Sequence, residues 1–143
     1  MAKITFKGLE EYETLLSRLG KESGRIAGMA VYQGADIVAD SIRQNIASLP
    51  QRTGVTKRGL EEGFGIAPLQ NDNGFYNVKL GFHGYNADGK PNAMMARLLE
   101  SGKSNLPKTA FVRKAVKSSK KEAEAKMAEV IDNEIKKIMD TKE

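Results

Sequence analysis

The sequence predicts an α+β fold: a small, mostly antiparallel sheet packed against two long α-helices, with long flexible loops between the elements. Two observations indicate this fold. Apolar residues recur at helical spacing near both ends of the chain. In the middle, Asn73–Gly74, a pair that favours a tight hairpin turn, separates two strand-like stretches. With 143 residues, the chain fits one domain over residues 1–143.

The N-terminal third is predicted to form a strand followed by two helices. Polar and apolar residues alternate over 3–7, as in a short half-buried strand. A helical stripe follows over 9–19, and Gly20 is the expected end of that helix. A longer helix is expected over 22–48, ended by Pro50. Its apolar face comprises Val31, Ala35, Val38, Ile42, Ile46 and Leu49. Within it, the spacing of Gly24 and Gly28 indicates a close helix contact in the core or in an oligomer.

The rest of the chain is predicted as loops, a hairpin and two further helices. Residues 51–59 are polar, basic and rich in glycine, which indicates a mobile surface loop. The hairpin arms are expected over 60–69 and 75–82, followed by a second flexible loop over 83–92. The side chains of the second arm that should face the core are Tyr76, Val78, Leu80 and Phe82. A short helix over 93–100 and a final helix over 109–139 complete the fold. The expected apolar stripe of the final helix comprises Val116, Ala123, Met127, Ile131, Ile135 and Ile138.

Composition restricts the kinds of site and leaves the partner open. The chain has no cysteine, which excludes disulfides and thiolate metal sites and agrees with a reducing cytoplasm. No apolar run reaches the roughly 18 residues that span a bilayer, and we expect no secretory signal. With 23 Lys and Arg against 18 Asp and Glu, the formal net charge is +5. This balance permits contact with nucleic acid or with an acidic protein surface and requires neither.

No motif indicates an enzyme, so we predict no catalytic residue, no cofactor and no metal. His83 is the only histidine, whereas a zinc site needs three or four donors. The glycines of Gly63–Gly65 and Gly81–Gly84 fall within the predicted hairpin. A phosphate loop instead places its glycines between a strand and a helix. Adjacent carboxylates, such as Glu61 and Glu62, do not face one another on a helix or a strand.

A basic run opens the predicted final helix. It consists of Arg113, Lys114, Lys117, Lys120 and Lys121, before the first acidic residue at Glu122. On a helix, residues 113, 117, 120 and 121 share one side. Two interpretations stay open: a solvated lysine-rich face, or an electrostatic contact with an acidic partner or with DNA phosphates.

The order of the segments resembles the small neck proteins of long-tailed phages and prophages, the head–tail joining and tail-completion family. The similarity rests on Thr53–Gly54 before the hairpin, on Leu99–Gly102 at the end of the short helix, and on Pro107–Ala115 leading into a charged terminal helix. The family's Glu-aromatic-Gly-Thr pattern maps to Glu100–Lys103, with serine and lysine substituted. Its Pro-Phe-Leu-Arg-Pro-Ala pattern maps to Ala110–Ala115 without either proline.

This resemblance implies a non-enzymatic structural protein of the virion, present in the host cytoplasm during assembly. Members form rings, usually hexamers, at the joint between head and tail, and DNA passes through the lumen. The implied partners are other copies of the chain, head-completion proteins on the portal side, and tail-tube or tail-terminator proteins. Contact with the passing DNA is also implied, and contact with a membrane is not.

The expected interface residues form three groups. The first group, expected at a subunit or DNA-channel contact, comprises the loop cations Arg52, Lys57 and Arg58. The second group is expected to shape an elbow before the final helix and comprises Glu100, Gly102 and Phe111. The third group, expected to make polar contacts, comprises Arg113 and Lys117. The alternative function is a basic DNA-binding module.

Overall fold

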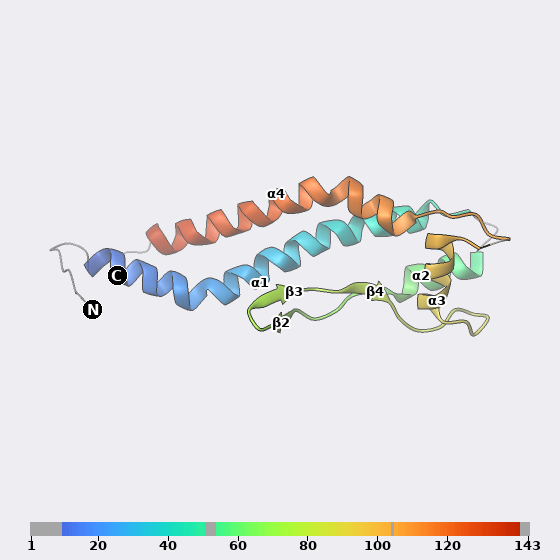
Figure 1. The fold of residues 1–143 in the computed structure, drawn as a ribbon, viewed down its shortest axis with the longest axis horizontal. Helices are drawn as coiled ribbons and strands as arrows, with labels where there is room; N and C mark the ends of the chain where they lie inside the picture. Colours follow the sequence, from blue (N-terminus) through green and yellow to red (C-terminus); the bar gives the residue numbers. More distant parts are fainter. Residues whose placement is uncertain (1–9, 51–53, 104, 141–143) are drawn as a thin grey trace.

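A computed structural model describes residues 10–50, 54–103 and 105–140, with side chains from residue 17 onward (Figure 1). It confirms the predicted α+β class. The elements in chain order are α1 (Glu10–Ala47), α2 (Gly54–Gly63), β1 (Phe64–Ile66), β2 (Gln70–Asp72), β3 (Phe75–Asn77), β4 (Leu80–Phe82), α3 (Asn92–Ser101) and α4 (Phe111–Asp140). The strand predicted over 3–7 lies outside the described residues.

The elements form an elongated body in which α1 is the central layer. α4 runs back along α1 on one side, and the β-strands lie along the other side (Figure 1). The short helices α2 and α3 lie beside each other at the end of the body where α1 ends and α4 begins (Figure 1). The outer faces of α4 and of the β layer therefore point in opposite directions.

α1 is one continuous helix, so the predicted break at Gly20 is wrong. Gly20 lies inside α1 and is exposed, and a side chain there would meet nothing within 4 Å. A glycine inside a helix costs about 1 kcal/mol relative to alanine. Packing of the long helix against α4 offsets that cost, because tertiary contacts rather than propensity stabilise most helices.

The β layer consists of two antiparallel two-stranded ladders. β1 pairs with β4 in the register Phe64↔Phe82, and β2 pairs with β3 in the register Gln70↔Asn77. The predicted turn is confirmed, since Asn73 and Gly74 both have positive φ, at 55° and 93°. The first hairpin arm begins and ends later than predicted, because residues 60–63 belong to α2 and Gln70–Asp72, expected in the connection, form β2. In the second arm Tyr76, Val78, Leu80 and Phe82 are half-buried, as predicted, and Phe75 is exposed. The alternation fails at Asn77, which was expected to face outward and is half-buried.

The segment predicted as a mobile loop over 51–59 contains the first turns of α2. α2 forms because Leu60 is fully buried and because Gly59 and Gly63 let the helix approach α3 closely. Residues 51–53, which include Arg52, lie outside the described residues.

The main core lies at the end of the body where α1 ends and α4 begins, and where α1, α2, α3 and α4 meet β1 and β4. Its buried residues include Ile42, Ile46, Leu49, Leu60, Phe64, Leu99 and Phe111. Along α4 the buried face runs through Ala115, Ser119, Ala123, Val130, Glu134 and Ile138. The predicted α4 stripe is therefore wrong at Val116, which is exposed because Ala115 takes the buried position beside it.

The glycines of α1 face two different neighbours. Side chains at Gly24 and Gly28 would collide with Tyr76 and Leu69 of the β layer. A side chain at Gly34 would collide with Met127 of α4. The close contact predicted from Gly24 and Gly28 is thus made with the hairpin, and the close helix contact is made by Gly34.

Candidate functional site

The junction between α3 and α4 is an elbow closed by the carboxylate of Glu100. Glu100 is near the end of α3, and its two oxygens accept backbone N–H groups from the first turn of α4. The distances are 2.8 Å from Oε1 to the nitrogen of Val112 and 3.1 Å from Oε2 to the nitrogen of Arg113. A carboxylate here satisfies donors that have no partner inside the helix and lies at the positive end of the helix dipole.

The chain between the two helices makes a tight reversal. Gly102 has φ 77°, and its N–H donates to the carbonyl of Leu98 at 2.7 Å. A Cβ at Gly102 would lie 2.8 Å from the nitrogen of Lys108, so no side chain fits. Thr109 then donates both its N–H and its hydroxyl to the carbonyl of Leu99, at 2.9 and 2.7 Å.

Phe111 fixes the first turn of α4 to the core. Its ring is buried and lies edge-on to Phe82, with centroids 6.1 Å apart. Its carbonyl accepts a hydrogen bond of 2.9 Å from Nδ2 of Asn45 in α1. Glu100, Gly102 and Phe111 therefore all lie in the junction, and together they link α3, α4, α1 and β4.

The other expected interface residues lie elsewhere. The side chains of Arg113 and Lys117 are exposed on the outer face of α4. Lys57 donates from Nζ to the carbonyl of Leu49 at 3.2 Å, which ties α2 to the end of α1. Arg58 lies 3.8 Å from Glu62 in an exposed ion pair. The predicted loop cations Lys57 and Arg58 are thus on α2, where Lys57 contacts the segment after α1 and Arg58 pairs within the helix.

Sequence reasoning missed a cluster of buried asparagines beside α2. Oδ1 of Asn86 accepts the N–H groups of Asp88 and Lys90 at 2.9 and 3.0 Å, which closes the loop after β4. Nδ2 of Asn92 donates to the carbonyl of His83 at 2.9 Å. The segment predicted as a flexible loop over 83–92 is thus held by internal hydrogen bonds. Asparagine and glycine at short spacing are the signal for this turn.

Oδ1 of Asn92 is buried without a hydrogen-bond partner among the described residues. A side chain at Gly59 would collide with this oxygen. The close contact of α2 with α3 therefore depends on glycine.

Two aromatic side chains in and beside the β layer are largely exposed. Phe75, next to the β2–β3 turn, is 78% exposed, and Tyr85, in the loop after β4, is 72% exposed. Aromatic residues are enriched where proteins contact one another. The turn and the loop lie toward opposite ends of the β layer (Figure 1).

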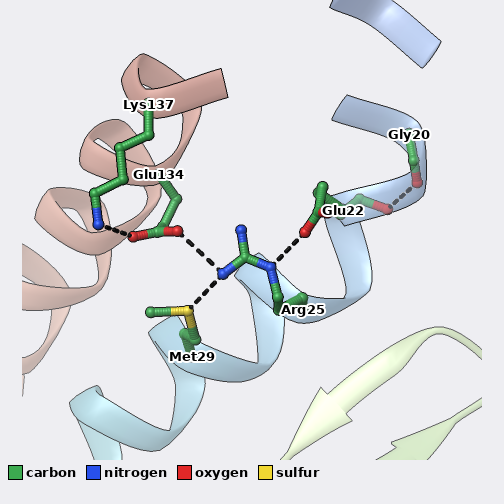
Figure 2. Close-up of polar contacts among 7 residues, drawn as sticks. Gly20, Glu22, Arg25, Met29, Glu134 and Lys137 are labelled. Atoms are coloured by element: carbon green, nitrogen blue, oxygen red, sulfur yellow. Dashed lines mark hydrogen bonds and ion pairs between the residues drawn. The ribbon is translucent and has the colours of Figure 1, made fainter. Parts of the chain in front are cut away.

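At the far end of the helix pair, Arg25 and Glu134 connect α1 to α4 (Figure 2). Nη1 of Arg25 lies 3.1 Å from Oε1 of Glu134, and Nζ of Lys137 lies 2.9 Å from Oε2. Glu22 also pairs with Arg25. Hydrogen bonds from Lys137 and then Arg25 lower the pKa of Glu134 below its ordinary value of 4.5, against the opposing effect of burial.

Within residues 17–50, 54–103 and 105–140, no group of three or more His, Asp or Glu side chains is placed to hold a metal ion. His83 is exposed beside the β1–β4 ladder. In the same part of the chain, no helix has the length and apolar character that crossing a bilayer requires.

Comparisons of this chain with protein-family models, with curated proteins and with solved structures found no match.

Proposed function

We propose that this chain is a structural protein that joins head and tail in a tailed phage or prophage particle. In this proposal, copies of the chain assemble into a ring at the neck or at the end of the tail, and DNA passes through the ring. The partners on either side are portal-side head-completion proteins and tail-tube or tail-terminator proteins.

The observation that carries the proposal is the exposure of Phe75, next to the β2–β3 turn, and of Tyr85, in the loop after β4. Large aromatic side chains that are exposed to water contribute little to the stability of the core. When a partner covers them, their burial stabilises the complex. Because the two residues lie in different segments, each can contact a different surface of a neighbouring subunit or partner protein. A contact between two different surfaces generates a ring when its rotation closes.

The elbow supports the same proposal. The residues that carry the resemblance to the neck family, Glu100, Gly102 and Phe111, meet in one junction. That junction sets the direction of α4 relative to the rest of the body. A protein that acts through shape needs such a fixed angle, because neighbouring subunits must repeat the same contact around a ring.

Variants at the exposed aromatics test the proposal in a phage or prophage that encodes the chain. Phe75→Ser together with Tyr85→Ser should leave the thermal midpoint within a few degrees of the unchanged protein and should reduce the yield of joined, infectious particles at least tenfold. The matched control is Val116→Ser with Met139→Ser, which removes two exposed apolar side chains from α4. Full infectivity of the Phe75/Tyr85 variant, or equal loss in the control, would overturn the proposal.

A further inference from the structure

We propose that the outer face of α4 near its N-terminus binds the phosphate backbone of duplex DNA without regard to base sequence. This basic face consists of Arg113, Lys114, Lys117, Lys120 and Lys121. The inference does not rest on the proposed function, because DNA binding is a property of the isolated chain and particle joining is not.

The basic face accounts for the whole net charge of the protein. Its segment, 113–121, contains five cations and no acidic residue. Removing these five from the 23 Lys and Arg leaves 18, equal to the 18 Asp and Glu. The remainder of the chain is therefore balanced, and the excess positive charge is concentrated on less than three turns of one helix.

The five cations are also exposed and unpaired. Several cations elsewhere have acidic partners: Arg25 with Glu134, Arg43 with Asp40, and Lys126 with Glu129. Among the described residues, no carboxylate forms an ion pair with any side chain of the basic face. The nearest acid along the helix, Glu122, instead lines a polar groove between α4 and α1.

The position of the cations lowers the stability of the free helix. Arg113 and Lys114 lie in the first turn of α4, where the helix dipole disfavours positive charge. Arg113, Lys117 and Lys121 follow at successive four-residue steps, and like charges at this spacing repel by about 0.2–0.5 kcal/mol per pair. A polyanion along this face relieves both effects.

The chemistry of the face favours phosphate over an acidic protein surface. Four of its five cations are lysine, a residue depleted in protein–protein interfaces but common in phosphate contacts. The face spans about 12 Å along the helix, from a rise of about 1.5 Å per residue. Over that length duplex DNA presents about seven phosphate charges, at one per roughly 1.7 Å. Five cations over the same length therefore neutralise most, but not all, of these charges.

Two absences in the sequence define the mode of binding. After Phe111, which is buried, α4 has no aromatic residue on which unpaired bases can stack. The segment 113–121 also has no Asn or Gln for bidentate contacts to adenine. The expected ligand is therefore a duplex rather than a single strand, and adenine contacts do not contribute to its recognition.

The test measures fluorescence anisotropy of a labelled duplex of about 24 base pairs against the full chain, between 25 and 200 mM salt. We expect the logarithm of the affinity to fall with the logarithm of salt concentration with a slope near −4.5, from about −0.9 for each of five phosphate contacts. The triple variant Lys117→Gln, Lys120→Gln, Lys121→Gln should weaken binding at 25 mM salt at least tenfold and make the slope shallower by about 2.7.

The matched control removes three lysines outside the basic face: Lys79→Gln, Lys90→Gln, Lys108→Gln. All three are exposed, and the change in net charge is the same. Circular dichroism verifies that both variants are folded. The proposal expects the control to bind within threefold of the unchanged chain, and a second duplex of unrelated sequence to bind equally well. It is overturned if no binding occurs at 25 mM salt, if both triple variants lose affinity equally, or if single-stranded DNA or polyglutamate binds more tightly than the duplex.

Discussion

Glu100 and Val112 join two helices across the elbow: the carboxylate at the end of α3 accepts the backbone N–H of Val112 at 2.8 Å, inside the first turn of α4. The contact spans twelve residues of sequence and bridges the reversal around Gly102. With the contacts of Thr109 and Phe111, it fixes the angle between α3 and α4.

Replacing Glu100 by alanine should destabilise the protein by about 1–2 kcal/mol, the usual cost of removing a helix cap. Urea denaturation followed by circular dichroism measures this. Glu124→Ala is the control, because Glu124 is exposed on α4 and caps no helix. If the two variants unfold at the same urea concentration, Glu100 does not hold the elbow.

Gly102→Ala should destabilise the protein by about 1–3 kcal/mol, because residue 102 has positive φ and a Cβ there meets the backbone of Lys108. Gly81→Ala is the comparison, since a side chain at Gly81 meets nothing within 4 Å. The midpoints of thermal unfolding of the two variants are compared with that of the unchanged protein. An unchanged midpoint for Gly102→Ala would show that the reversal tolerates a side chain.

The glycines of the helices should respond in opposite directions. Gly20→Ala should stabilise the protein by about 0.5–1 kcal/mol, because the position is exposed and in the middle of α1. Gly63→Ala should destabilise it, because a side chain there collides with the carbonyl of His83 and with Asn92. The free energy of unfolding of each variant, compared with the unchanged protein, gives the sign of each effect. A loss of stability in Gly20→Ala would argue against a continuous α1.

Glu134 should make stability depend on pH in the acid range. Its pKa is lower in the folded chain than its ordinary 4.5, so it stabilises the fold above pH 4.5. That contribution is lost as the pH falls through the lowered pKa. The thermal midpoint of the unchanged protein should therefore exceed that of Glu134→Gln at pH 7, and the gap should narrow below pH 4.5. A constant gap from pH 7 to pH 3 would contradict the ion pairs with Arg25 and Lys137.

The fold class and the long helices could be predicted because local sequence patterns indicate them without any knowledge of tertiary contacts. Apolar spacing located α1 and α4, and Asn73–Gly74 located the turn, because only a few residue types accept positive φ. Glu100, Gly102 and Phe111 were expected at the elbow, and they lie there. The contacts that they make, to Val112, Lys108 and Phe82, depend on folding and are not visible in the sequence.

Two of the errors share one cause. Glycine was interpreted as an end of structure at Gly20 and as a sign of a loop in the segment that holds Gly59. In the structure these glycines lie inside helices, and Gly59 allows α2 to approach Asn92. The sequence alone does not distinguish a glycine that ends a helix from a glycine that lets a helix pack closely. The difference depends on which element lies next to the glycine in the folded structure.

Electron microscopy of particles made by a phage or prophage from which the gene for this chain has been deleted tests the proposed function most directly. The proposal predicts separate heads and tails in the deletion strain, and joined particles again when the gene is supplied on a plasmid. Complete, infectious particles in the deletion strain would contradict it.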